Sequence, residues 1–137
     1  MKKKFNHVPL SIITLILAIL LSGCDFTKIK VGEVRVMYGS NEDGHISYDF
    51  KTFTGFESGS AQVEKGEIIF FEYRATVDKG SLLIEWQDPN GEIVWQKTLS
   101  ESEHRNVEIG IETSGKYTII IQGKNAAGNF DVSWMKE

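Results

Sequence analysis

The sequence has little cysteine, little proline and no excess of basic residues. One cysteine, Cys24, in 137 residues excludes a small domain held together by disulfides. Two prolines, with 41% hydrophobic and 25% charged residues, exclude a collagen-like or disordered chain. The formal net charge of −4 argues against nucleic acid as a partner, since nucleic-acid binding requires a basic surface. The composition therefore predicts one globular domain.

Long apolar runs are also scarce, and the one present lies near the N-terminus. Lys2, Lys3 and Lys4 precede an uncharged run over residues 10–21, which as a helix would be about 18 Å long. That is shorter than the ~30 Å hydrocarbon core of a bilayer. The run therefore predicts a signal helix rather than a spanning helix, and its being the only one excludes a multi-span membrane protein.

The segment ends in Leu21-Ser22-Gly23-Cys24, which resembles the lipobox of bacterial lipoproteins. The resemblance covers residues 1–24 and implies a cleaved signal peptide over residues 1–23, with Leu21, Ser22 and Gly23 recognised by the signal peptidase. It also implies a diacylglycerol-derived anchor on the Cys24 sulfur, with acyl chains such as palmitate. Two chains hold a protein stably, because each buried CH₂ contributes about 0.8 kcal/mol. The alternative is a buried free cysteine behind an uncleaved anchor.

Cleavage would leave Cys24 and a short tether over residues 25–30, at most about 20 Å long when extended. It would also remove three lysines, so that twelve basic residues face nineteen acidic ones and the net charge becomes −7. Anionic headgroups repel such a domain, so the lipid alone would hold it at the extracytoplasmic face of the cell membrane. Asp25 resembles an inner-membrane retention signal, which has meaning only in a cell with two membranes.

Residues 31–137 alternate between apolar and polar with no sustained helical period. Ile69, Phe71 and Tyr73, for example, share one face, and Glu72 and Arg74 share the other. Turn residues at 57–60, 78–80, 88–91 and 123–128 separate the runs. This pattern predicts an all-β fold of about eight to nine strands, an antiparallel β-sandwich of the jelly-roll kind.

Four local motifs follow one another between residues 65 and 134. They are a Lys65-Gly66 entry, the Asp88-Pro89-Asn90-Gly91 hairpin, a strand from Ser114-Gly115-Lys116-Tyr117, and a closing strand with Phe130 and Val132 after Gly128. This order resembles small extracytoplasmic modules of the pre-peptidase C-terminal and Golgi-dynamics kinds. The resemblance implies a binding or accessory domain and transfers no site residue.

Catalytic chemistry has little support in the sequence. Beyond the signal segment only His45 and His104 remain, both among polar residues that favour loops, and no hydrolase, metalloprotease or P-loop motif occurs. The sequence therefore predicts a protein that is not an enzyme and has no cofactor. A small envelope enzyme remains the alternative.

A metal site has weak candidates in Asn41, Glu42 and Asp43, whose oxygen atoms in a tight acidic turn suit Ca²⁺. The spacing does not match an EF-hand, and acidic turns are common on soluble surfaces. The turn therefore remains a candidate only.

Aromatic residues are more numerous, and exposed rings are typical of a sugar-binding face. Trp86 and Trp134 lie two and four positions from apolar residues, so they are on the same strand face as these residues and are predicted to lie in the core. Trp95 follows a hairpin beside Gln96 and is the main candidate for a ligand-facing ring, with Tyr38 and Phe53 as further candidates. We therefore expect a lipid-anchored binding module for an envelope protein or polysaccharide, with a carbohydrate- or Ca²⁺-binding site as the alternative.

Overall fold

The computed structural model describes residues 35–137, and every regular element in this range is a β-strand. The strands are β1 (Arg35–Glu42), β2 (His45–Val63), β3 (Ile68–Gln87), β4 (Ile93–Leu99), β5 (Glu103–Gly110) and β6 (Gly115–Lys136). All pairs are antiparallel, in the order β1-β2-β6-β3-β4, with β5 beside β3. Within the described range no helix could cross a membrane. The signal segment, Cys24 and the tether lie outside the described residues.

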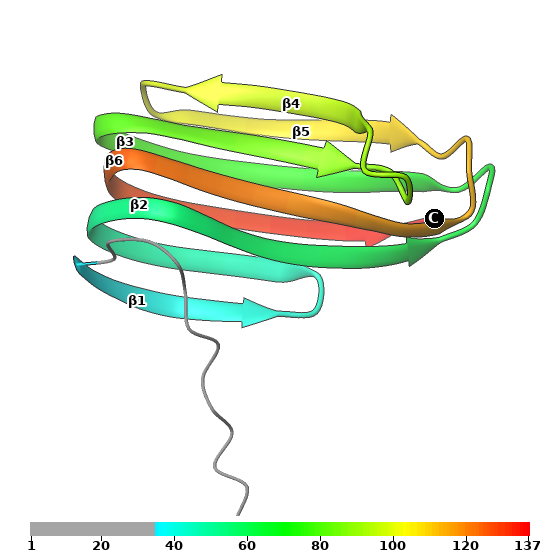
Figure 1. The fold of residues 1–137 in the computed structure, drawn as a ribbon, viewed down its shortest axis with the longest axis horizontal. Helices are drawn as coiled ribbons and strands as arrows, with labels where there is room; N and C mark the ends of the chain where they lie inside the picture. Colours follow the sequence, from blue (N-terminus) through cyan, green and yellow to red (C-terminus); the bar gives the residue numbers. More distant parts are fainter. Residues whose placement is uncertain (1–34) are drawn as a thin grey trace, which may run out of the picture.

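The strands β2, β3 and β6 are long because each runs through both layers of a sandwich (Figure 1). Their pairing shifts register in the middle, between Phe50 and Gly55 in β2 and between Val77 and Ser81 in β3. The chain turns over from one layer into the other at these shifts. In β6 the bend requires Gly128, because its φ is +136° and a Cβ there would lie 1.9 Å from the Thr76 carbonyl oxygen.

Each layer combines halves of the long strands. Sheet I contains β1, residues 45–50 of β2, residues 128–136 of β6, residues 68–77 of β3, and β5. Sheet II contains residues 55–63 of β2, residues 115–124 of β6, residues 81–87 of β3, and β4. The two layers hold five and four strand segments, which confirms the predicted jelly-roll β-sandwich of eight to nine strands.

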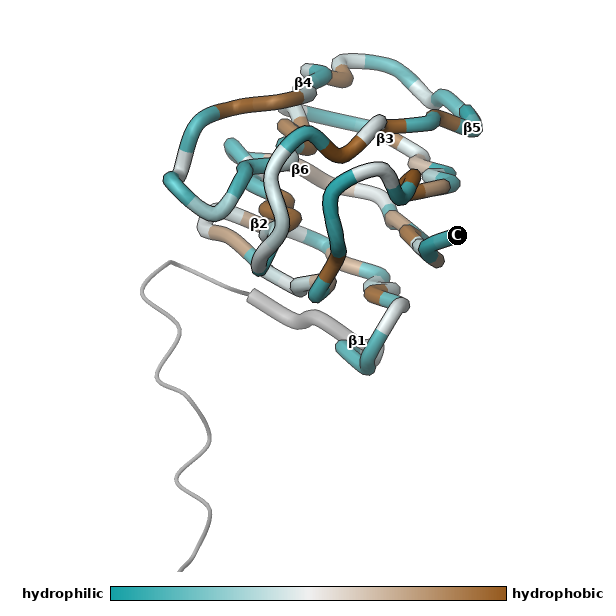
Figure 2. The backbone as a smooth tube through the Cα atoms, turned by 90° about the vertical axis from the view of Figure 1, so that its right-hand side faces the viewer, coloured by the Kyte–Doolittle hydropathy of each residue, from teal (hydrophilic) through white to brown (hydrophobic). Residues whose placement is uncertain are grey.

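The core lies between the two sheets and is built from alternate residues of each strand. Figure 2 shows hydrophilic and hydrophobic residues interspersed along the backbone. Trp86 is fully buried as predicted, whereas Trp134 is only partly buried and meets it edge to face at 5.8 Å. The turn predicted at residues 57–60 is wrong, because β2 continues through it. Gly59 lies there because a Cβ would come within 2.5 Å of the Trp134 ring. The other fully buried large side chains are Tyr73, Phe53, Phe130, Ile46, Ile69, Leu82, Ile84, Leu99, Ile119, Ile121 and Val63.

One lateral edge of the sandwich, between β4 and β5, is closed by polar contacts. The Tyr73 hydroxyl donates a hydrogen bond to Glu103 Oε1 at 2.7 Å, and Lys97 Nζ of β4 lies 3.5 Å from Glu103 Oε2. Burial and the Glu103 carboxylate raise the pKa of Tyr73 above its ordinary value. The hydrogen bond from Tyr73 and the charge of Lys97 lower the pKa of Glu103. Glu103 therefore joins a strand of sheet I to a strand of sheet II.

Candidate functional site

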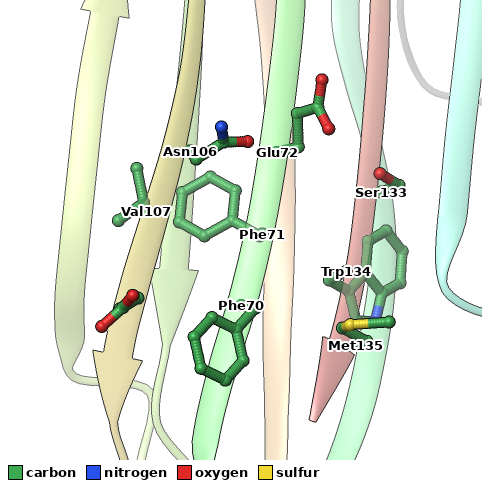
Figure 3. A pocket seen from close by; sticks show the side chains of 9 residues that line it. Phe70, Phe71, Glu72, Asn106, Val107, Ser133, Trp134 and Met135 are labelled. Atoms are coloured by element: carbon green, nitrogen blue, oxygen red, sulfur yellow. The ribbon is translucent and has the colours of Figure 1, made fainter.

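The outer face of sheet I has a hollow of about 390 Å³ where β5, β3 and β6 lie side by side (Figure 3). Its outward side chains follow from the register, because Phe70 pairs with Glu108 and Met135, while Glu72 pairs with Asn106 and Ser133. Phe71, Val107 and Trp134 complete the lining. We call this feature the sheet I hollow.

Phe70 and Met135 give the hollow its apolar part. The Phe70 ring is half-buried and seen nearly face-on in Figure 3, and the Met135 side chain is 63% exposed. Phe70 has the parity of the polar residues of β3, so its ring lies outside the core. An aromatic face exposed in a hollow can stack against an apolar part of a ligand.

The remaining side chains supply hydrogen-bonding groups. Asn106, Glu108 and Ser133 make no side-chain hydrogen bond within residues 35–137, so their polar atoms are open to solvent or a ligand. Glu72 uses Oε1 for both its protein contacts, with His104 Nε2 at 2.6 Å and Arg74 at 3.6 Å. The hollow therefore combines the outward Phe70 ring with an amide, a hydroxyl and two carboxylates.

The two histidines lie on this same face, which corrects the expectation that they occupy loops. His104 is in β5 beside Glu72, and His45 is in β2 with its Nε2 3.2 Å from Asp131 Oδ1. Both histidine–carboxylate pairs are partly exposed, so each contributes little to the stability of the fold. The alternation of strand residues brings them to one face although they are far apart in the sequence.

Ser133 lies opposite both Glu72 and His45 in the register, which places a hydroxyl between a carboxylate and an imidazole. Acyl transfer by a serine requires a hydrogen bond from its hydroxyl to the base. In the part of the chain that the structure describes, the His45 imidazole contacts Asp131 rather than Ser133. The arrangement offers hydrogen bonds to a bound molecule but does not form a nucleophile and base pair.

The aromatic candidates from the sequence lie elsewhere. Phe53 is 1% exposed and packs against Phe50 and Phe130, so the expectation of a ligand-facing ring there is wrong. β2 bends and shifts register beside Phe53, and the ring faces the core there. Trp95 is partly buried, with its ring 4.8 Å from that of Phe71, and it lines a second cavity described below. Tyr38 belongs to β1, but its side chain lies outside the described residues.

The acidic turn after β1 has a structural contact. The Asn41 amide donates to the Ser58 carbonyl at 3.0 Å and to Glu57 Oε2 at 3.4 Å, which joins β1 to the sheet II half of β2. Glu42 pairs with His45 in the strand register and Asp43 follows in the turn. Between residues 35 and 137 no three His, Cys, Asp or Glu side chains are grouped so that they could hold a metal ion.

Phe70 is the residue that sequence reasoning missed. Its position between Ile69 and Phe71 makes it look like part of an apolar run. The signal was present, since Phe70 shares the parity of Glu72 and Arg74 on the polar face. An aromatic residue that shares a strand face with charged residues is a candidate for binding.

No family model matches the chain, and no curated protein matches it. Several solved structures are similar to this chain. One is a family 4 carbohydrate-binding module with a TM-score of 0.52 and 10% identity, covering 78% of this chain and 79% of that one. Another is a carbohydrate-binding module from the Cellvibrio mixtus lichenase 5A in complex with cellotriose, with a TM-score of 0.43 and 11% identity, covering 75% and 85% of the two chains.

A third is a family 61 carbohydrate-binding module in complex with β-1,4-galactotriose, with a TM-score of 0.44 and 15% identity, covering 74% and 69% of the two chains. At these identities the similarity shows the fold alone. The chain has the β-sandwich fold of the family 4 carbohydrate-binding module.

Proposed function

We propose that the protein is a non-catalytic binding module, anchored to the membrane through Cys24, that binds a carbohydrate in the sheet I hollow. The observation that carries the proposal is the half-buried, outward Phe70 ring beside Asn106, Glu108 and Ser133, whose side chains make no hydrogen bond within the described residues. The fold shared with the family 4 module is compatible with this function. The choice of a carbohydrate rests on the chain's own residues.

A sugar ring presents an apolar C–H face and a rim of hydroxyl groups, and the hollow is complementary to both. Phe70 can stack against the C–H face. The Asn106 amide, the Ser133 hydroxyl and the Glu108 carboxylate lie around it and can pair with ligand hydroxyls. Because the hollow is open on a sheet face rather than enclosed, it suits part of a polymer better than a small metabolite.

The anchor is supported by the sequence of residues 1–24. The basic start, short apolar run and lipobox-like ending fit a lipoprotein signal, and the short tether would keep the domain close to the extracytoplasmic surface. An envelope polysaccharide is the carbohydrate within reach of a domain held there. The protein would act by holding such a polymer, or a protein attached to it, near the membrane.

Binding is tested by titrating the mature protein with a panel of neutral oligosaccharides, using calorimetry. The panel contains cello-, β-1,4-galacto- and N-acetylglucosamine oligomers. Phe70→Ala should weaken binding at least tenfold, which corresponds to about 1.4 kcal/mol, because the stacking surface is lost. Phe56→Ala is the matched control, since Phe56 is 57% exposed but lies on sheet II. No binding to any member, or equal losses in both variants, would refute the proposed site.

The anchor is tested separately by metabolic labelling with a fatty acid. The wild-type protein should be labelled and should partition with membranes, whereas Cys24→Ala should lose the label and the partitioning. If the variant partitions as the wild type does, the lipoprotein assignment is wrong.

A further inference from the structure

A second cavity lies beside the sheet I hollow, between the β3–β4 hairpin and the end of β5. Its volume is about 560 Å³, which is within the range of small-molecule sites. Four carboxylates line it, from Asp88, Glu92, Glu108 and Glu112, and its lining contains no Lys, Arg or His. Glu108 lines both this cavity and the hollow, so the two spaces adjoin.

The hairpin holds Asp88 in a fixed position at the cavity. Its Oδ1 accepts hydrogen bonds from the backbone N–H groups of Asn90 and Glu92, both at 2.8 Å. These bonds favour the charged carboxylate and lower the pKa of Asp88. One side of the cavity therefore carries a negative charge within a rigid turn.

Tyr117 is a second, independent sign of a ligand. Its side chain is 98% buried, since only 2% of the residue is exposed, and its hydroxyl has no hydrogen bond within residues 35–137. Among the described residues Trp86 Nε1 is the only fully enclosed side-chain polar atom without a partner. The Tyr117 hydroxyl must therefore reach open space, and the space that its side chain lines is this cavity.

Trp95 completes the lining. Its ring is partly buried and is held by Phe71 and Tyr73, with ring centroids at 4.8 Å and 5.9 Å. A tryptophan ring attracts a cation, and the surrounding carboxylates attract it as well. A hydroxyl, a ring and several carboxylates together form a suitable environment for an organic ammonium group, and the volume of the cavity exceeds what a bare ion needs.

We infer that this cavity is a subsite for an ammonium group on the bound ligand, which makes the ligand class a glycan with free amino groups. The inference rests on the proposed function, because Glu108 connects the cavity to the hollow in which the sugar ring is bound. A sugar stacked on Phe70 can thus direct an amino group of a neighbouring unit past Glu108 towards Asp88 and Tyr117.

The test compares glucosamine hexamer with N-acetylglucosamine hexamer, which differ in charge but not in backbone. Calorimetry at pH 6 and moderate salt should show about tenfold tighter binding of the glucosamine hexamer. The double variant Glu92→Gln with Glu112→Gln should reduce this preference to less than threefold and leave the affinity for the acetylated hexamer unchanged. Neither residue lines the sheet I hollow.

The double variant Glu64→Gln with Glu101→Gln is the matched control, because it removes the same charge from exposed positions outside the cavity lining. This control variant should retain the tenfold preference for the glucosamine hexamer. Tyr117→Phe should lose part of that preference. Equal affinities of the wild type for both hexamers, or the same reduction in both double variants, would overturn the inference. The neutral panel judges the proposed function separately, so a protein that binds neutral sugars through Phe70 without this preference refutes the subsite alone.

Discussion

The two outer faces of the sandwich are built from the same three long strands but differ in chemistry. The outer face of sheet I carries two histidine–carboxylate pairs, the half-buried Phe70 ring and a hollow. The outer face of sheet II carries Ser, Thr and Gln side chains together with the apolar residues Phe56, Leu83, Val94 and Ile120. The alternation that forms the core therefore leaves two outer surfaces of different chemistry.

The two outer faces differ although halves of the same three strands form both of them. Each long strand must present polar residues outward in both halves, so solubility alone explains serine and threonine on either face. It does not explain the half-buried Phe70 ring, which lies between Glu108 of β5 and Met135 of β6 in the register. We therefore attribute Phe70 and its neighbours to binding and the face of sheet II to solubility.

The largest effect is expected from substituting phenylalanines in two environments, the core and the outer face of sheet II. Phe53→Ala should lower the free energy of unfolding by about 3–5 kcal/mol, because it empties a fully enclosed position. Phe56→Ala, on the exposed face of sheet II, should change it by less than about 0.5 kcal/mol. Urea denaturation measures both. A small cost for Phe53→Ala would contradict the placement of this ring in the core.

A smaller effect is expected at the edge where the two sheets meet. Tyr73→Phe removes the hydrogen bond to Glu103 and should lower stability at neutral pH by about 1 kcal/mol. The lowered pKa of Glu103 means that its contribution is present above its unfolded value of about 4.5 and is lost as the pH falls below it. The raised pKa of Tyr73 means that its contribution is present below about 10 and is lost at higher pH.

Denaturation midpoints at pH 3, 7 and 10.5 test this pair. The wild type should be less stable at pH 3 and at pH 10.5 than at pH 7. Tyr73→Phe should reduce both of these losses of stability, and Glu103→Gln should reduce the loss at pH 3. An unchanged profile in Tyr73→Phe would show that the contact does not couple the sheets.

The smallest effect is expected for the ion pairs on the face of sheet I. Asp131→Asn removes the partner of His45, and because both groups are partly exposed the loss should be about 0.5 kcal/mol or less. It should shrink further in 1 M salt, which screens such pairs. A loss above 2 kcal/mol that persists in salt would mean that this face stabilises the fold rather than binding a ligand.

Much of the fold could be predicted from the sequence because period-2 alternation separates inward from outward residues, as it does for Ile69, Phe71 and Tyr73. The turn predicted at residues 57–60 failed because Gly59 is required by the Trp134 ring from the opposite sheet rather than by a turn. Such a contact depends on tertiary packing, and a local pattern does not contain it.

The candidate site was less predictable for the same reason. His45 and His104 are 59 positions apart in the chain, and only the register of β2, β6, β3 and β5 places them on one face. Phe53 was misassigned because the bend in β2 changes its parity. Trp95, chosen as an exposed ring, lines the second cavity, but nothing in the sequence indicates that Tyr117 and Glu108 lie around it.

The most direct measurement is an NMR titration of the ¹⁵N-labelled mature protein with the tightest-binding oligosaccharide of the panel. We expect the backbone amides of Phe70, Glu72, Asn106 and Ser133 to shift, while those of Phe56, Thr118 and Ile120 on the outer face of sheet II stay unchanged. Shifts confined to the outer face of sheet II, or no shift with any oligosaccharide, would contradict the assignment of the binding site to sheet I.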